Sequence, residues 1–269
     1  MTQATADTPK VLASGLFAGK SAIVTGAGSG IGRAIAIRLV QLGMRVTGIG
    51  RRVEALEETA RLVEGMDGGF DHFSCNVRDS AEAAALVERV GAQSGLDLLV
   101  NNAGGQFFAP AVDISRRGWD SVIDLNLTSV FVLTKAAHPF LKASRGAVVN
   151  ISLSGVDRGS MGLAHSIAAR AGVLGLTRTL ALEWAADGIR LNCIGPGTVV
   201  TAGFSDEADA SGVARLIDAT PLGRATTAGE VAELTAFLAS PAGAMMSGQL
   251  IQIDGAAHLG AGLNLFSGH

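Results

Sequence analysis

Short runs of consecutive apolar residues alternate with longer segments whose apolar positions recur at helical spacing, from Ser21 almost to the end of the chain. Continuous apolar runs are typical of strands that are buried on both faces of a sheet, whereas strict alternation would indicate one solvated face. The pattern predicts seven such strands, at Ser21–Thr25, Arg45–Gly50, Phe70–Asn76, Leu96–Asn101, Ala147–Ser152, Arg190–Ile194 and Gln249–Asp254.

The segments between these runs carry the 3.6-residue period of helices that cover a sheet. The predicted helices are Ile31–Leu42, Val53–Val63, Ala81–Gln93, Gly118–Ala143, Gly162–Ala186 and Ala228–Ala239. Regular alternation of strand and helix predicts one α/β domain with a doubly wound parallel sheet of about seven strands.

Two segments do not follow this alternation. Residues 1–18 are predicted to form an arm ahead of a domain that covers residues 19–269. The irregular stretch near 202–222 follows the carboxyl end of a strand, where open α/β sheets bind their ligands. We expect this stretch to be a substrate lid, with a surface helix that does not contact ligand as the alternative.

Composition narrows the possible partners and the location. A hydrophobic content of 48% supplies a large core, and the net charge of -3 without a Lys/Arg run argues against nucleic acid or an acidic membrane surface. The polar segment Met1–Lys10 lacks the apolar region of a signal peptide, and no apolar run is long enough to span a bilayer. We therefore expect a cytoplasmic protein. The two cysteines and five histidines show no ligand spacing, so no metal site is expected.

A glycine run joins the first predicted strand to the first predicted helix. Gly26 permits a tight turn, Gly30 lets the backbone approach a pyrophosphate, and Gly32 lets the helix pack closely on the strand. Ser29 and Ile31 place the helix N-terminus, with its free N–H groups and positive dipole end, beside the phosphates. The run predicts a dinucleotide site, and the alternative is a tight turn without a ligand.

The end of the second predicted strand distinguishes between cofactors. An acidic residue there binds the ribose 2′-hydroxyl of NAD(H) and repels a 2′-phosphate. This chain has Arg51 and Arg52 instead, with no acid before Glu54. Guanidinium groups suit a phosphate, so NADP(H) is favoured over NAD(H). The alternative is that one or both arginines are solvated residues at a helix start.

Further short motifs complete a family resemblance. They are Asn101-Asn102-Ala103-Gly104, Asn126 in Asp124-Leu125-Asn126-Leu127, Pro196-Gly197 with Thr201, and Gly248-Gln249 with Asp254-Gly255. With the glycine run, they resemble the short-chain dehydrogenase/reductase superfamily over residues 19–255. The resemblance implies a Rossmann domain that binds a nicotinamide cofactor.

The same resemblance assigns further residues to the cofactor and implies an assembly. It implies that Asn76 and Val77 flank the adenine, that Asn102, Ala103 and Gly104 support it, and that Pro196, Gly197, Val199 and Thr201 hold the nicotinamide carboxamide. It also implies a homotetramer or homodimer that packs through the two long helices at 118–143 and 162–186.

The usual catalytic pair of that superfamily is absent. Most members use a Ser, a Tyr that transfers the proton and a Lys four residues later, but this chain contains no tyrosine. Alignment through Ala171-Gly172 places Ser166 at the Tyr position and Arg170 at the Lys position. A serine hydroxyl is a much weaker acid than a phenol, and arginine stays protonated, so the alcohol–ketone mechanism has lost its acid/base pair.

The helix residues at these positions are candidates for altered roles. We expect Ser166 to contact a cofactor or substrate oxygen, unless it is only a small residue on a helix face. Arg170 lies on the same face and is expected to hold the ribose, with a surface ion pair as the alternative. His165 titrates near neutrality and could be a general acid, although it points about 100° away from Ser166 on a helix.

Three other residues are candidates near the reacting atoms. Ser152 and Ser154 lie near the superfamily's Ser position and could donate to the substrate oxygen, or could satisfy backbone groups at a strand end. By the resemblance, Asn126 anchors a water at a helix kink, and the alternative is a hydrogen bond in a helix interior.

The local sequence narrows the resemblance further. Gly104-Gly105-Gln106-Phe107 and the run from Ala164 to Val173 look like peroxisomal trans-2-enoyl-CoA reductases, NADPH-dependent enzymes that also lack Tyr-x-x-x-Lys. This implies reduction of the C=C bond of a 2-enoyl-CoA or related enone, in fatty acid metabolism. Two alternatives stay open: a carbonyl reductase or alcohol dehydrogenase with a substitute proton donor, and a non-redox lyase, cyclase or structural partner that keeps the nucleotide pocket.

Overall fold

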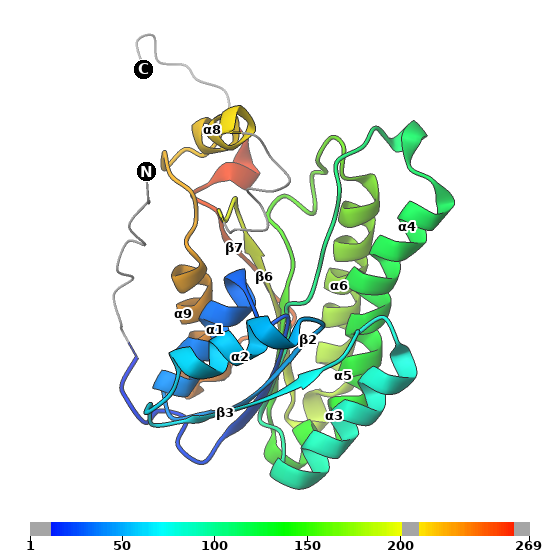
Figure 1. The fold of residues 1–269 in the computed structure, drawn as a ribbon. Helices are drawn as coiled ribbons and strands as arrows, with labels where there is room; N and C mark the ends of the chain where they lie inside the picture. Colours follow the sequence, from blue (N-terminus) through cyan, green and yellow to red (C-terminus); the bar gives the residue numbers. More distant parts are fainter. Residues whose placement is uncertain (1–11, 201–209, 261–269) are drawn as a thin grey trace.

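A computed structural model of the chain describes residues 12–200 and 210–260. It confirms the doubly wound α/β domain with a seven-stranded sheet in the order β3-β2-β1-β4-β5-β6-β7 (Figure 1). Every neighbouring pair of strands is parallel. The strands are β1 Ser21–Thr25, β2 Arg45–Gly50, β3 Gly69–Ser74, β4 Leu98–Asn101, β5 Ala147–Ile151, β6 Arg190–Pro196 and β7 Leu250–Ile253.

Helices cover both faces of this sheet (Figure 1). One layer consists of α1 (Gly30–Gln41), α2 (Val53–Leu62) and α9 (Ala228–Ala239), and the other of α3 (Ser80–Ser94), α4 (Arg116–Ile123), α5 (Ser129–Ser144) and α6 (Ala164–Glu183). Each layer has its own apolar core against the sheet, with Leu39 and Val231 in one and Leu86 and Leu133 in the other. Burial on both faces explains why the strands are apolar at consecutive positions.

The segment expected to be helical at Gly118–Ala143 is helical, but it is not uniform. It is divided into α4, a π-helical turn at Asp124–Thr128, and α5. Asn126 lies in that turn, where its side-chain amide makes two hydrogen bonds with the backbone of Gly105. The extra residue of a π turn rotates the side chains that follow it, and such turns are frequent at functional sites.

The two segments outside the alternation are described only in part. Residues 1–11 of the expected arm lie outside the described residues, but Phe17 is buried in the core and its N–H donates to the Leu42 carbonyl at 2.9 Å. Residues 201–209 of the expected lid also lie outside the described residues. The rest of that stretch contains a helix, α8 (Ala210–Asp218), as the alternative of a surface helix requires, and α8 leads to a turn hydrogen-bonded to Gly255.

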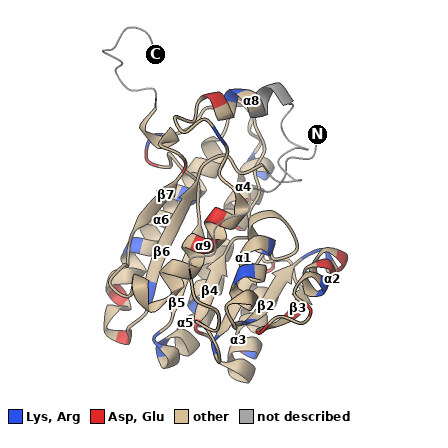
Figure 2. Cartoon of the chain, turned by 90° about the vertical axis from the view of Figure 1, so that its left-hand side faces the viewer, with Lys and Arg blue, Asp and Glu red and all other residues tan. Residues whose placement is uncertain are grey.

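Basic and acidic residues are interspersed along the described chain (Figure 2). Among the helices that the structure describes, none is long and apolar enough to cross a bilayer. Within the same residues, no three His, Cys, Asp or Glu side chains are grouped to hold a metal ion.

Candidate active site

A cavity of about 350 Å³ opens at the carboxyl ends of the central strands. It brings together most of the residues that the sequence assigned to a nucleotide, from four separate segments. They are Gly26, Ser29, Gly30 and Ile31 after β1, Arg51 and Arg52 after β2, Asn76 and Val77 after β3, and Asn102, Ala103 and Gly104 after β4.

The glycine run after β1 adopts a backbone that other residues resist. Gly26 and Gly30 have φ of 69° and 53°, in the left-handed region that favours glycine. A Cβ on Gly32 would lie 2.3 Å from the Gly26 carbonyl oxygen and 2.4 Å from Asn102 Nδ2, so the start of α1 packs directly on the turn. Ser29, at the N-cap of α1, makes no capping hydrogen bond with its side chain. The first N–H groups of α1 therefore face the cavity without the side-chain cap that Asp79 provides for α3.

Asn102 and Thr25 fasten the β4 motif to the glycine run. The Asn102 side chain donates to the Thr25 carbonyl at 2.9 Å, and the Thr25 hydroxyl accepts the N–H groups of Asn102 and Ala103, each at 2.9 Å. The two sequence motifs therefore form one unit across the adjacent strands β1 and β4.

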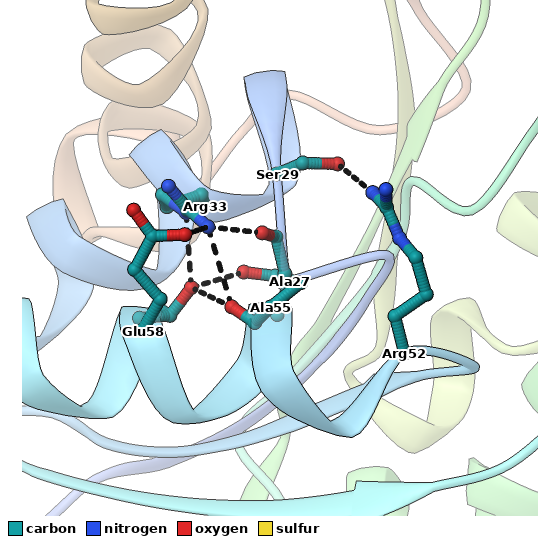
Figure 3. A network of polar contacts seen from close by, with 8 residues as sticks. Ala27, Ser29, Arg33, Arg52, Ala55 and Glu58 are labelled. Carbon is teal, nitrogen blue, oxygen red and sulfur yellow. Dashed lines mark hydrogen bonds and ion pairs between the residues drawn. The ribbon is translucent and has the colours of Figure 1, made fainter. Parts of the chain in front are cut away.

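Arg33 braces the outer wall of the same loop (Figure 3). Its guanidinium donates to the Gly28 carbonyl at 2.5 Å and pairs with Glu58 of α2 at 2.6 Å. Thr59 adds a hydrogen bond to the Ala27 carbonyl at 2.9 Å. These contacts hold α1 and α2 at fixed positions on either side of the loop.

Three arginines line the cavity, and no acidic residue does. Arg52 donates to the Ser29 hydroxyl at 3.2 Å (Figure 3), while Arg51 and Arg78 are exposed. None of the three makes an ion pair with another described residue. Sequence reasoning missed Arg78; its position directly after Asn76-Val77 was the available signal. The cavity is therefore positively charged and suited to phosphate groups.

A second group of polar side chains lies beside this cavity, where α6 meets the end of β5. Arg170 Nη1 donates to the carbonyls of Ile151 at 3.0 Å and Ser152 at 3.2 Å. A Cβ on Gly104 would lie 3.2 Å from Arg170 Nη2 and 2.9 Å from the Asn126 side-chain oxygen. Burial lowers the pKa of Arg170 to about 10, which leaves its guanidinium charged at neutral pH. Arg170 thus places a positive charge under the floor of the nucleotide cavity.

Ser166 is fully buried and held by two partners. Its hydroxyl donates to Gln106 Oε1 at 2.7 Å and accepts a longer hydrogen bond from Arg170 Nε at 3.4 Å. Gln106 was part of the resembling motif but not a predicted site residue. The contact joins segments 60 residues apart, so no local sequence pattern could indicate it.

His165 is also fully buried, and burial lowers its pKa. Its Nδ1 accepts a hydrogen bond from the Ser166 N–H at 2.8 Å. Its ring packs edge-on against the Phe107 ring, with 4.3 Å between the ring centroids. Nε2 is buried and finds no hydrogen-bond partner among the described residues. A buried neutral imidazole behind Phe107 is a poor position for a general acid in this conformation.

The two serines at the end of β5 differ in environment. Ser152 is buried, and its hydroxyl lacks a hydrogen-bond partner in the described part of the chain. Ser154 is half-buried, and its N–H donates to the Pro196 carbonyl at 2.9 Å. Both serines follow the end of β5, where the Asn150 side chain donates to the Thr177 hydroxyl of α6.

The residues expected at the nicotinamide lie apart from the described cavity. Pro196 ends β6, a Cβ on Gly197 would lie 2.9 Å from the Asp254 backbone, and Val199 forms a bridge with Thr226. Thr201 lies outside the described residues. The structure thus assembles the nucleotide end of the site more completely than the nicotinamide end.

Comparisons with known proteins agree with this arrangement. A family model described as enoyl-(acyl carrier protein) reductase matches residues 26–258. A Bacillus subtilis protein named probable 2,4-dienoyl-CoA reductase is 39% identical over 242 residues, which cover 88% of this chain and 95% of that protein. A 3-oxoacyl-[acyl-carrier-protein] reductase of Thermotoga maritima is 36% identical, over 88% of this chain and 97% of its own.

Solved structures show the same similarity. A Beutenbergia cavernae protein described as an NAD(P)-dependent gluconate 5-dehydrogenase, with NADP bound at low occupancy, aligns with a TM-score of 0.86. It is 35% identical, and the match covers 91% of this chain and 99% of that chain. The family match, the relatives and the seven-stranded parallel sheet together show that this chain belongs to the short-chain dehydrogenase/reductase superfamily, whose members are oxidoreductases that bind a nicotinamide cofactor.

Proposed function

We propose that this oxidoreductase uses NADPH to reduce the C=C bond of a 2-enoyl thioester or a related enone. The observation that carries the proposal is the pairing of a complete nucleotide cavity with an altered proton-transfer site. The chain has no tyrosine, and Ser166 and Arg170 stand where the superfamily has its Tyr and Lys. Neither residue is suited to protonating an alkoxide oxygen, because a serine is a weak acid and an arginine retains its proton.

The residues present fit an NADP(H) molecule. The first N–H groups of α1 and the glycine run suit the pyrophosphate, and Arg51, Arg52 and Arg78 suit the 2′-phosphate. Asn76 and Val77 flank the adenine in this proposal, and Arg170 holds the ribose. When bound, the nicotinamide supplies the hydride.

Reduction of a conjugated C=C bond places modest demands on the protein. The electrons of the double bond move onto the carbonyl oxygen, and the α-carbon takes its proton afterwards from water. The enzyme must orient the acyl group and stabilise the enolate oxygen, both of which rigid hydrogen-bond donors can do. The Bacillus subtilis relative is named for the reduction of a conjugated dienoyl-CoA to a 2-enoyl-CoA, which supports C=C reduction in an acyl thioester as the type of reaction.

The reduction of a ketone is the second candidate, because other relatives are named 3-oxoacyl-[acyl-carrier-protein] reductases. That reaction needs a proton at oxygen. The side chains available are Ser152, whose buried hydroxyl has no partner among the described residues, and Ser154. We propose that these two serines contribute to substrate orientation in the favoured reaction.

The direct test is oxidation of NADPH by purified protein with trans-2-enoyl-CoAs, matched 3-ketoacyl-CoAs and simple ketones, followed by nicotinamide absorbance. We expect turnover with the enoyl thioesters and at least about tenfold lower kcat/KM with the ketones, which corresponds to about 1.4 kcal/mol. Turnover of ketones but not enoyl thioesters would establish the second candidate. Tight NADPH binding without oxidation by any substrate would favour a non-redox role.

A further inference from the structure

The side-chain amide of Gln106 is held more firmly than a residue in a surface loop requires. The preceding residue, Gly105, is held by Asn126, which accepts its N–H at 3.1 Å and donates to its carbonyl at 2.8 Å. Asn126 is itself 4% exposed in the π-helical turn. Both the N–H and the carbonyl of the residue before Gln106 are therefore held by hydrogen bonds.

The hydrogen bonds of Ser166 fix the orientation of that amide. Arginine has only donors, so Ser166 accepts from Arg170 Nε at 3.4 Å and has one proton of its own to donate. Ser166 is completely buried, so this proton needs an acceptor within the protein, and Gln106 lies 2.7 Å away. The Gln106 oxygen therefore faces Ser166, and its NH2 group points elsewhere.

The Gln106 NH2 group makes no hydrogen bond to the described residues, and it is not among their buried polar atoms that lack a partner. Two N–H donors are thus left accessible beside Gly104, which lines the nucleotide cavity. The Ser166 hydroxyl, in contrast, is enclosed and its proton is already donated. The Ser166 hydroxyl, which was first expected to contact the substrate oxygen, is therefore unavailable for that contact, whereas the Gln106 NH2 group is available.

We propose that Gln106 is the catalytic residue that donates a hydrogen bond to the carbonyl oxygen of the substrate, and that Ser166 is its positioning residue. This inference rests on the proposed function and deepens it. Bound NADPH would supply a hydride for the β-carbon, and Gln106 would hold the carbonyl oxygen on which the negative charge of the enolate develops as the C=C electron pair shifts. A proton from solvent then completes the saturated α-carbon, so one NADPH and one proton are consumed for each double bond.

An amide donor also defines the class of substrate. Gln106 stabilises an enolate but has no proton to transfer at neutral pH, so it cannot complete the reduction of an unconjugated ketone to an alcohol. The site therefore selects carbonyl compounds with a conjugated double bond, where resonance spreads the charge and the proton goes to carbon.

The decisive variant is Gln106→Glu, which keeps the size of the side chain and an acceptor for Ser166 but replaces the NH2 donors with a carboxylate oxygen. We expect kcat with trans-2-octenoyl-CoA to fall about 100-fold, the usual effect of removing one oxyanion donor. NADPH affinity, measured by fluorescence titration, is expected to change less than threefold. Gln93→Glu makes the same chemical change on the exposed end of α3 and is expected to leave kcat unchanged.

The role of Ser166 is tested by a double-mutant cycle. Ser166→Ala alone is expected to lower kcat about tenfold with little change in KM, and to add less than threefold to the loss in Gln106→Glu, because both changes act on one donor. Independent losses that multiply would overturn the positioning role and return Ser166 to direct contact with the substrate.

A second readout does not depend on turnover. Hexadienoyl-CoA bound with NADP⁺ should show a red-shifted ultraviolet band, because a hydrogen bond polarises the conjugated thioester. The shift should vanish in Gln106→Glu and persist in Gln93→Glu. If the wild-type protein reduces enoyl thioesters and Gln106→Glu keeps more than a third of kcat with the shift intact, this inference fails and the proposed function stands. If the wild-type protein reduces no enone at all, both fail.

Discussion

The two halves of the site are held together by different kinds of contact. In the nucleotide half, the turn from Gly26 to Gly32 and the adjacent Asn102 fit together through backbone atoms, with no space for a single additional carbon on Gly32. In the catalytic half, the side chains of Gln106, Ser166 and Arg170 contact one another instead. Backbone requirements restrict the residue type at a position, whereas a side-chain network can exchange several members together. The difference shows why a chain can keep its cofactor cavity while its proton-transfer chemistry changes.

The largest effect is expected from Gly32→Ala, which breaks the nucleotide half. The new Cβ would lie 2.3 Å from a backbone oxygen, so α1 must move away from β1 and the loop loses its shape. We expect NADPH affinity in a fluorescence titration to fall at least about 100-fold, equivalent to about 2.7 kcal/mol.

Gly69→Ala is the matched control, because its Cβ would meet only the Arg45 side chain at an ordinary 3.8 Å. Circular dichroism of both variants separates a local change from unfolding. NADPH affinity of Gly32→Ala within threefold of the wild-type protein would show that the loop is more adaptable than its contacts indicate.

A smaller loss of NADPH affinity is expected from substitution of the cavity arginines. These variants test whether the nucleotide half recognises the 2′-phosphate. Substitution of Arg51, Arg52 or Arg78 by Ala should weaken NADPH binding about tenfold each, because a charge-assisted hydrogen bond to the 2′-phosphate is lost. NADH has no such phosphate, so its affinity should change less than twofold. The control is Arg61→Ala. Arg61 lies in α2, the helix that begins directly after Arg52, but it does not line the cavity.

The same two titrations, of NADPH and of NADH, can also contradict this prediction. Equal losses for NADPH and NADH would mean that the arginines bind the shared pyrophosphate or only stabilise the loop. The proposed preference for NADP(H) would then have no support from these residues.

The smallest effect concerns His165 in the catalytic half and is measured as stability. Burial lowers the pKa of His165 in the folded protein, whereas the unfolded chain has an ordinary imidazole pKa near 6.5. The unfolded state therefore binds a proton that the folded state resists, and the free energy of unfolding should decline as pH falls below about 6.5. The contribution of one group is limited to about 1.4 kcal/mol per pH unit.

Urea unfolding at several pH values checks this prediction with His165→Gln as the comparison. The wild-type protein should lose more stability between pH 7 and 5.5 than the variant does. Parallel pH profiles would show that His165 takes up a proton in the folded protein as readily as in the unfolded chain, and would reopen its role as a general acid.

The geometry of the glycine turn could be predicted from the sequence because each requirement there falls on consecutive residues. The turn at Gly26, the close packing of Gly32 and the uncapped start of α1 all follow one strand, and Asn102 follows another. Arg78 was missed because an isolated arginine before a helix is common on surfaces, and its position directly after Asn76-Val77 was the one sequence signal for it.

The catalytic half was less predictable because its contacts join distant segments. Nothing near Ser166 in the sequence indicates that Gln106 accepts its proton. The π-helical turn between α4 and α5 was expected only as the kink at Asn126 that the resemblance implies, because helical periodicity continues through Asn126 and its partner Gly105 lies 21 residues earlier. The identities of Ser166 and Arg170 revealed an altered site, but the arrangement of its hydrogen bonds needed the structure.

The enclosure of Ser166 has a consequence for protein engineering. Because Gln106 occupies the space in front of the Ser166 hydroxyl at 2.7 Å, a phenol ring at position 166 would collide with that side chain. Gly104 similarly leaves just enough room for Arg170 and Asn126 together. Introducing a Tyr at position 166 would therefore require a smaller side chain than Gln106 in the same variant.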